Sequence, residues 1–258
     1  MIKPRRVPFY RGFLWIYEGF QLVFKSPFGW MKTMSLWFGF SLLCSLVMVI
    51  GPILFSILLP ILFAGLMVGC RTIDQGRSLQ ASHLFAGFLN QPARLIRLGG
   101  VNLLGEVLLT LILTLWGGQQ MDALQHLTLD GNGNLDQLQV LLGQLTPLFI
   151  VLSLIQILLL MMGWFAPALL VFSNMSTAQA LALSGQACAL NTLPFLAYSL
   201  GMGALLVVFI TTAFAVPLLG GILFMIAVPT IVAAVYASYQ DIFRDVLDLE
   251  DSRWTRVE

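Results

Sequence analysis

Two long stretches of the chain have no charged side chain, and they constrain its fold more than any other feature. No Asp, Glu, Lys or Arg occurs from Thr33 to Cys70 or from Gln137 to Gln240. A helix crosses the hydrocarbon core of a bilayer with roughly 20 apolar residues, so each stretch is long enough for more than one crossing. Apolar residues make up 59% of the 258 residues, which is more than a soluble domain of this size can bury. The predicted fold class is therefore an all-α polytopic membrane protein.

Glycine and proline divide these stretches into individual membrane helices. Gly51-Pro52 separates the first two, and Val216-Pro217 separates the last two. The six predicted transmembrane helices cover roughly residues 29–50, 53–72, 95–116, 147–172, 194–215 and 218–240. They pair as three hairpins over residues 29–72, 95–172 and 194–240, and the second hairpin carries an outer loop at 117–146.

Each hairpin is predicted to follow a short helix on the cytoplasmic face. These helices lie within the basic N-terminal segment 1–28, at 78–90 and at 177–190, and a cytoplasmic tail at 241–258 completes a single integral membrane domain. In the first helix, Arg11, Glu18 and Lys25 are seven residues apart and form one narrow polar stripe, so this helix is expected to lie flat in the membrane interface. The 177–190 helix has no charge and many small residues, and it is expected to pack against other helices.

The charges fix the predicted orientation of the chain. All 13 Lys and Arg residues fall on one side of the membrane once six crossings are drawn. The other side has only the acidic residues Asp122, Asp130 and Asp136. Because loops rich in Lys and Arg stay in the cytoplasm, both termini are predicted to be cytoplasmic.

A ten-residue segment occurs twice and indicates an internal repeat. Gly51–Pro60 reads GPILFSILLP and Gly220–Pro229 reads GGILFMIAVP, so six of the ten positions are identical. The second and sixth predicted membrane helices are therefore interpreted as copies of one unit.

Several segments resemble a known group of proteins. They are Trp15 with Gly19, Trp30, Leu59–Arg71 (LPILFAGLMVGCR), His83–Phe88 (HLFAGF) and Val235–Phe243 (VYASYQDIF). In these segments the chain resembles an uncharacterised family of proteobacterial six-helix inner-membrane proteins. The resemblance implies a multi-pass location in the bacterial inner membrane. The family has no known activity, so the resemblance supplies no catalytic residues.

The strongest candidate site inside the membrane surrounds Glu106, near the middle of the third predicted crossing. An ionised carboxylate there costs about 3 kcal/mol or more, so it must be protonated or face protein or water. Polar residues recur every four positions along the same helix face, with further polar groups on the fourth crossing: Asn102, Glu106, Thr110 and Thr114, then Ser153 and Gln156. The stripe is interpreted either as a proton- or cation-coupled path or as a neutral hydrogen bond between helices.

A weaker candidate lies in the outer loop. Oxygen-bearing side chains alternate at Asp130, Asn132, Asn134 and Asp136, as in the first half of a calcium-binding loop. Position six is Leu135 instead of Gly, and the twelfth position, where such loops have Glu, is also Leu. A polar turn that caps the following helix explains the same residues.

The cytoplasmic face is rich in basic residues. We name these the basic rim: Arg5, Arg6, Arg11, Lys25, Arg71, Arg77, Arg94 and Arg97. The rim is interpreted either as part of structural anchoring or as a recognition surface for anionic lipid. A nucleic-acid partner is not expected, because the N-terminal cations are better explained as determinants of topology.

Catalytic motifs are absent from the sequence, so an enzyme, a cofactor and a resident metal are not expected. His83 and His126 are predicted on opposite faces of the membrane, and Cys44, Cys70 and Cys188 lack the spacing of metal ligands. The expected function is that of a non-enzymatic protein that organises the membrane by binding lipid or a membrane-protein partner. The alternative is a small transporter or channel with a polar path past Glu106.

Overall fold

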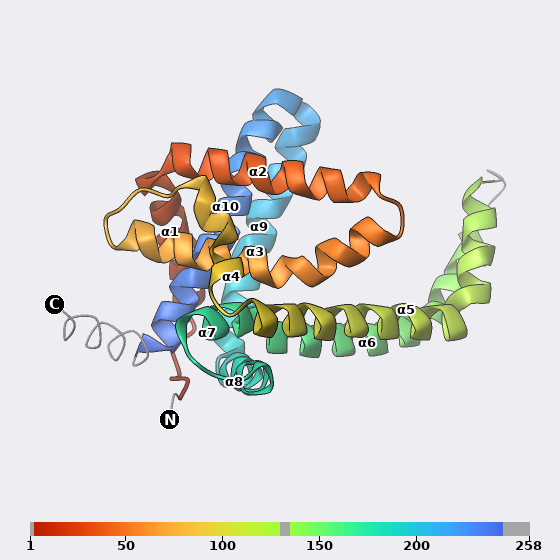
Figure 1. Ribbon diagram of the computed structural model, residues 1–258. Helices are drawn as coiled ribbons and strands as arrows, with labels where there is room; N and C mark the ends of the chain where they lie inside the picture. The colour runs from red at the N-terminus through yellow and green to blue at the C-terminus, as the bar shows by residue number, and fades with distance from the viewer. Residues whose placement is uncertain (1–2, 130–134, 245–258) are drawn as a thin grey trace.

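A computed structural model describes residues 3–129 and 135–244, and Figure 1 shows helices throughout these ranges. The α-helices are α1 (Arg11–Lys25), α2 (Pro27–Leu46), α3 (Ile50–Asp74), α4 (Ala86–Leu89), α5 (Pro92–Leu129), α6 (Leu135–Trp164), α7 (Ala166–Phe172), α8 (Thr177–Leu190), α9 (Thr192–Ala215) and α10 (Pro217–Ile242). A short 3-10 helix, η1 (Ala81–Phe85), precedes α4. No strand occurs in the described ranges, which confirms the all-α class.

Five helical segments of the described chain are long and apolar enough to cross a membrane. They are Ile50–Asp74, Pro92–His126, Leu135–Phe172, Thr192–Ala215 and Leu223–Ile242. α2 has 20 residues but is not among them. Its Lys32 and its several Ser and Thr residues lower its hydropathy. The sixth crossing, through α2, stays a prediction.

The predicted outer loop at 117–146 is helical wherever it is described. α5 continues to Leu129 and α6 begins at Leu135, so the loop is corrected to two helix extensions. A Cβ atom added at Gly117 would lie 2.8 Å from a methyl carbon of Leu148, so this glycine allows α5 and α6 to pack closely. The Leu and Gln residues of this segment are good helix formers. Its Gln and Asp residues make the segment polar, and this polarity reflects exposure instead of a loop.

Buried side chains gather at one end of the molecule, which we call the base. It comprises the N-terminal segment, α1, η1, α4, α7, α8 and the adjoining ends of the long helices. Its largest fully buried side chains include Trp15, Trp30, Phe165, Tyr236, Tyr239 and Phe243. All Lys and Arg residues within 3–129 and 135–244 lie in these segments or within a few residues of them.

The remaining halves of the long helices leave the base with apolar side chains on their surfaces. Leu104, Leu154 and Phe214 are 70%, 62% and 87% exposed. Figure 1 shows α5 and α6 running side by side away from the base, and they contact each other extensively. Apolar side chains need no protein contact where lipid surrounds them, so this exposure fits a membrane environment.

α1 lies along α10 and α9 instead of standing apart from them. Its Trp15, Leu22 and Val23 are buried, and Gly19 faces α10. A Cβ atom at Gly19 would lie 2.6 Å from the backbone nitrogen of Ala234, so only glycine permits this approach. The opposite face of α1 is aromatic and exposed, with Phe13, Tyr17, Phe20 and Phe24. Its location in the membrane interface stays a prediction, but its inner face is part of the core.

α8 occupies residues 177–190, as predicted, and packs on α6 and α7. Ser176 caps it, because its hydroxyl accepts a hydrogen bond from the Gln179 amide at 3.3 Å and the Gln179 side chain accepts one from the Ser176 amide at 2.9 Å. Ala180, Ser184 and Ala187 on its inner face are buried. The expected helix-to-helix packing of this segment is confirmed.

The two copies of the repeated segment follow turns of different length, residues 47–49 in one case and Val216 alone in the other, but their first glycines make the same contacts. A Cβ atom at Gly51 would overlap the carbonyl of Cys44, and one at Gly220 would lie 2.6 Å from the Cα of Ala213, seven residues earlier in both cases. The amide of each glycine donates to the carbonyl of the valine four residues before it, at 2.9 and 3.0 Å. The α2–α3 and α9–α10 turns therefore share one close approach that requires glycine.

Replacing Gly19 by Ala tests the packing of α1 on α10. The added methyl group meets backbone atoms that cannot move aside, so we expect a loss of about 1–3 kcal/mol in the free energy of unfolding, measured by denaturation in detergent micelles. The control is Gly100→Ala on α5, where no atom lies within 4 Å of the added Cβ. The control is expected to be neutral or stabilising, and an equal loss in both variants would contradict the close approach.

Candidate functional site

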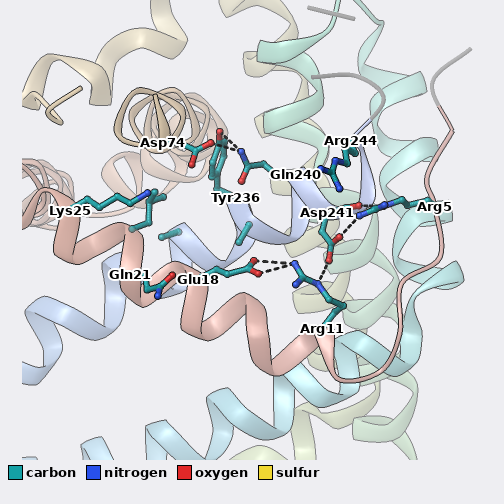
Figure 2. Close-up of a pocket in the computed structure, with 13 residues that line it drawn as sticks. Arg5, Arg11, Glu18, Gln21, Lys25, Asp74, Tyr236, Gln240, Asp241 and Arg244 are labelled. Carbon is teal, nitrogen blue, oxygen red and sulfur yellow. Dashed lines mark hydrogen bonds and ion pairs between the residues drawn. The ribbon is translucent and has the colours of Figure 1, made fainter. Parts of the chain in front are cut away.

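A polar cleft of about 430 Å³ opens in the base between the N-terminal segment, α1, the end of α3 and the end of α10. Figure 2 shows its charged and polar lining: Arg5, Arg11, Glu18, Gln21, Lys25, Asp74, Tyr236, Gln240, Asp241 and Arg244. Cations and carboxylates alternate around the cleft. Each wall is held by a separate set of contacts.

Asp241 is the centre of the first wall. Its carboxylate forms ion pairs with both Arg5 and Arg11 and accepts a hydrogen bond from the Trp15 indole at 3.0 Å. Its side chain is only 8% exposed. Figure 2 shows Arg5 and Arg11 reaching it from two different directions. A carboxylate this buried needs several donors to offset the loss of water, and these three supply them.

Arg11 also pairs with Glu18 at 2.9 Å, so two of the three residues in the predicted stripe of Arg11, Glu18 and Lys25 belong to one connected ion network. Burial raises the pKa of Glu18, and the nearby charge of Arg11 opposes this rise without cancelling it. Burial acts to lower the pKa of Arg11, but its hydrogen bond with Asp241 and the charge of Asp241 outweigh burial and raise it. Arg11 therefore remains charged throughout the physiological range.

Asn191 fastens the N-terminal segment to the end of α8. Its side-chain oxygen accepts a hydrogen bond from the Val7 amide at 2.9 Å, and its nitrogen donates to the carbonyls of Arg5 at 3.0 Å and Ala187 at 2.9 Å. It is 1% exposed. One buried side chain thus connects α8, the start of α9 and the chain that leads to α1.

The opposite wall of the cleft joins α3 to α10. The Gln240 amide donates to Asp74 at 2.7 Å and to the Tyr236 hydroxyl at 3.0 Å. This bridge holds the end of α3 against α10 beside the ion network.

The structure divides the basic rim into two groups. Arg5, Arg11, Arg71 and Arg94 make contacts within the protein. Arg94 donates to Asn174 at 2.8 Å and to the carbonyl of Met175 at 2.9 Å, and the Arg71 guanidinium lies 5.3 Å from the centre of the Phe172 ring. These contacts hold the base together.

The other rim residues are exposed. Arg6 and Lys25 form no ion pair within the described chain, Arg97 donates only to the Ala93 carbonyl of its own helix at 3.1 Å, and Arg77 donates to Gln75. Their charges are available to a partner outside the protein.

The intramembrane polar stripe lies on an open groove. Glu106, Thr110 and Thr114 line a groove of about 450 Å³ with Pro52 and Ile53 of α3. The Ser56 hydroxyl donates to the Glu106 carboxylate at 2.9 Å, which joins α3 to α5. The two threonine hydroxyls donate to backbone carbonyls of α5 itself.

Two predicted members of the stripe lie elsewhere. Asn102 faces α6, where a Cβ atom at Gly163 would lie 3.8 Å from its side-chain oxygen. Gln156 is an exposed residue of α6 and is not part of the groove wall. The structure therefore brings Glu106, Thr110 and Thr114 together and leaves Asn102 and Gln156 apart.

Three of the four candidate calcium ligands, Asp130, Asn132 and Asn134, lie outside the described residues. Asp136 is in the first turn of α6, where a carboxylate interacts favourably with the helix N-terminus. Within residues 3–129 and 135–244, no group of three or more His, Cys, Asp or Glu side chains could hold a metal ion.

Sequence reasoning missed Asp241 and Asn191 as centres of contact. Asp241 was assigned to the cytoplasmic tail, and Asn191 falls between the predicted helices at 177–190 and 194–215. The available signal was a lone Asp directly after a charge-free stretch, in a chain whose N-terminal segment is basic.

One curated relative supports the assignment of the chain to a class. A probable inner membrane protein of Burkholderia thailandensis is 28% identical over 198 residues, which cover 73% of this chain and 71% of that protein. Within residues 3–129 and 135–244, the present protein has five apolar helical segments long enough to span a bilayer. It is an integral membrane protein. No protein-family model matches it, and no solved structure matches it significantly. The relative agrees with the resemblance to inner-membrane proteins.

Replacing Asp241 by Asn tests the ion network. The change removes the anion that Arg5 and Arg11 share, so we expect the free energy of unfolding to fall by about 2–3 kcal/mol. This loss is smaller than that for a fully buried ion pair, because the Arg5 side chain is about half exposed. The measurement is denaturation in detergent micelles, with Asp74→Asn as a matched control expected to cost under about 1 kcal/mol. Arg11→Gln and Asp241→Asn together should cost less than the sum of the single changes; additive losses would contradict direct coupling.

Proposed function

We propose that the protein is a non-enzymatic integral protein of the bacterial inner membrane that organises the bilayer by binding anionic lipid at its base. The observation that carries the proposal is the gathering of all described Lys and Arg residues in the base. Among them, Arg6, Lys25, Lys32 and Arg97 are exposed and have no acidic partner in the described chain. Exposed cations next to a membrane surface attract anionic headgroups by roughly 1 kcal/mol each.

The proposal includes a topology of six crossings, in which α2–α3, α5–α6 and α9–α10 are three hairpins with both termini in the cytoplasm. The glycine contact common to α2–α3 and α9–α10 supports it, because α9 and α10 both contain candidate membrane spans and α2–α3 repeats this contact. The short helices α1, η1–α4 and α8 then lie on the cytoplasmic side. The exposed aromatic face of α1 suits the headgroup region.

The second candidate function is a small transporter or channel. The groove of Glu106, Thr110 and Thr114 favours this function. A carboxyl group at membrane depth is energetically unfavourable, so its presence beside an open groove indicates a functional use. The hydrogen bond from Ser56 favours the first function, since it gives Glu106 a structural use between α3 and α5.

Dependence on anionic lipid tests the proposed function. The purified protein should melt about 5 °C higher in micelles that contain phosphatidylglycerol than in phosphatidylcholine alone, since a ligand at about 100 times its Kd adds roughly 2.7 kcal/mol. Salt at about 1 M should remove most of the difference by screening. Equal melting temperatures in the two lipids would count against lipid binding.

Thiol labelling distinguishes the second candidate. Single cysteines at Asn102, Glu106, Thr110 and Thr114, in a variant without the three native cysteines, are treated with a small water-soluble thiol reagent. The lipid-binding function predicts protection at all four positions. Labelling of the three groove positions but not of Asn102 would instead indicate a hydrated path, and loss of that labelling pattern in a Ser56→Ala background would connect it to the groove.

A further inference from the structure

A second polar groove lies on the other side of Lys25, away from the Asp241 network. It consists of two adjoining pockets of about 530 and 350 Å³, which share Ser78 and Gln80. Lys25 and Lys32 line the first pocket, and Arg77 lines the second together with His83. No acidic side chain lines either pocket. The groove therefore differs from the Asp241 cleft, where carboxylates neutralise the cations.

A hydrogen bond and a close backbone contact hold the floor of this groove in place. The buried Ser26 hydroxyl accepts a hydrogen bond from the Leu79 amide at 3.2 Å, which fastens the segment before η1 to the junction of α1 and α2. A Cβ atom at Gly29 would lie 2.5 Å from the Leu79 carbonyl oxygen, so glycine is required for this contact. The positions from which Lys25 and Lys32 project are thus set by packing, while their charged ends remain exposed.

Apolar surface adjoins the cations. Phe28 lines the first pocket and is 73% exposed, and Phe24 and Met31 nearby are 54% and 50% exposed. A small soluble anion has no apolar part that could contact this surface. A lipid would place its phosphate among the cations and its acyl chains along the aromatic rings.

We infer that this groove binds the headgroup of an anionic phospholipid that carries two phosphates, one in each pocket. Lys25 and Lys32 bind the first phosphate, and Arg77, with His83 beside it, binds the second. Ser78 and Gln80 lie between them and donate hydrogen bonds to the bridging part of the headgroup. Basic pockets at the cytoplasmic ends of membrane helices suit lipids of this class. The inference rests on the proposed function and names its site and ligand.

The test is native mass spectrometry of the delipidated full-length protein in neutral detergent, titrated with diphosphatidylglycerol, phosphatidylglycerol or phosphatidylcholine. We expect the two-phosphate lipid to bind about tenfold more tightly than phosphatidylglycerol at equal phosphate concentration. Lys25→Gln with Lys32→Gln should weaken its binding about tenfold or more. Lys3→Gln with Arg244→Gln removes the same charge outside the groove and should change affinity less than about twofold. Ser78→Asp should weaken binding without removing any cation.

The outcomes separate the site from the general function. Equal losses in the two double variants, with anionic lipid still preferred over phosphatidylcholine, would overturn the groove and leave the proposed function standing. Equal binding of the one-phosphate and two-phosphate lipids would overturn the two-phosphate assignment. Displacement of the lipid by millimolar pyrophosphate would mean that the site takes a soluble anion. No preference for anionic lipid at all would overturn the proposed function itself. Melting curves of each variant verify that it is folded.

Discussion

A single buried carboxylate, Asp241, joins two ends of the chain that are 236 residues apart at Arg5 and 226 apart at Trp15. Because its charge is almost removed from water, it is stable only while its arginine and tryptophan donors surround it. These donors fix α1 along α10, and the glycines of α1 then allow direct backbone contact with α9 and α10. Asn191 extends the same connection to α8. The arrangement of the base follows from these contacts.

The surroundings of each part of the molecule explain which side chains it exposes. In the base, aromatic and small side chains are buried as in a soluble core, and ion pairs use part of the basic rim. Beyond it, the long helices expose leucine and phenylalanine, which lipid solvates at no cost. Glu106 interrupts this apolar region and is bridged to Ser56. The exposed cations Lys25, Lys32 and Arg77 lie in the base.

Local features of the sequence predicted much of this fold. Val216-Pro217 marked the α9–α10 turn, whereas Gly51-Pro52 lies in the first turn of α3, just after the α2–α3 turn. Residues 177–190 form the predicted short helix, and four of the five apolar segments of the described chain lie largely within the charge-free stretches. Contacts between distant residues could not be predicted, because nothing near Asp241 in sequence indicates Arg5 or Arg11. The polar composition of 117–146 was wrongly interpreted as a loop, since it reflects exposure and not a break in the helix. Asn102 and Gln156 share spacing with Glu106 but not its groove.

Three membrane hairpins can stand on one cytoplasmic base only if α2 crosses the bilayer. The most direct test labels single cysteines at Arg6, Arg77, Asp122 and Arg244 in intact and permeabilised cells with a membrane-impermeant thiol reagent, in a variant without native cysteines. Six crossings predict that Asp122 is labelled in intact cells and that the other three positions are labelled only after permeabilisation. Labelling of Arg6 from the side opposite to Arg77 and Arg244 would show that α2 does not cross, and would contradict the account.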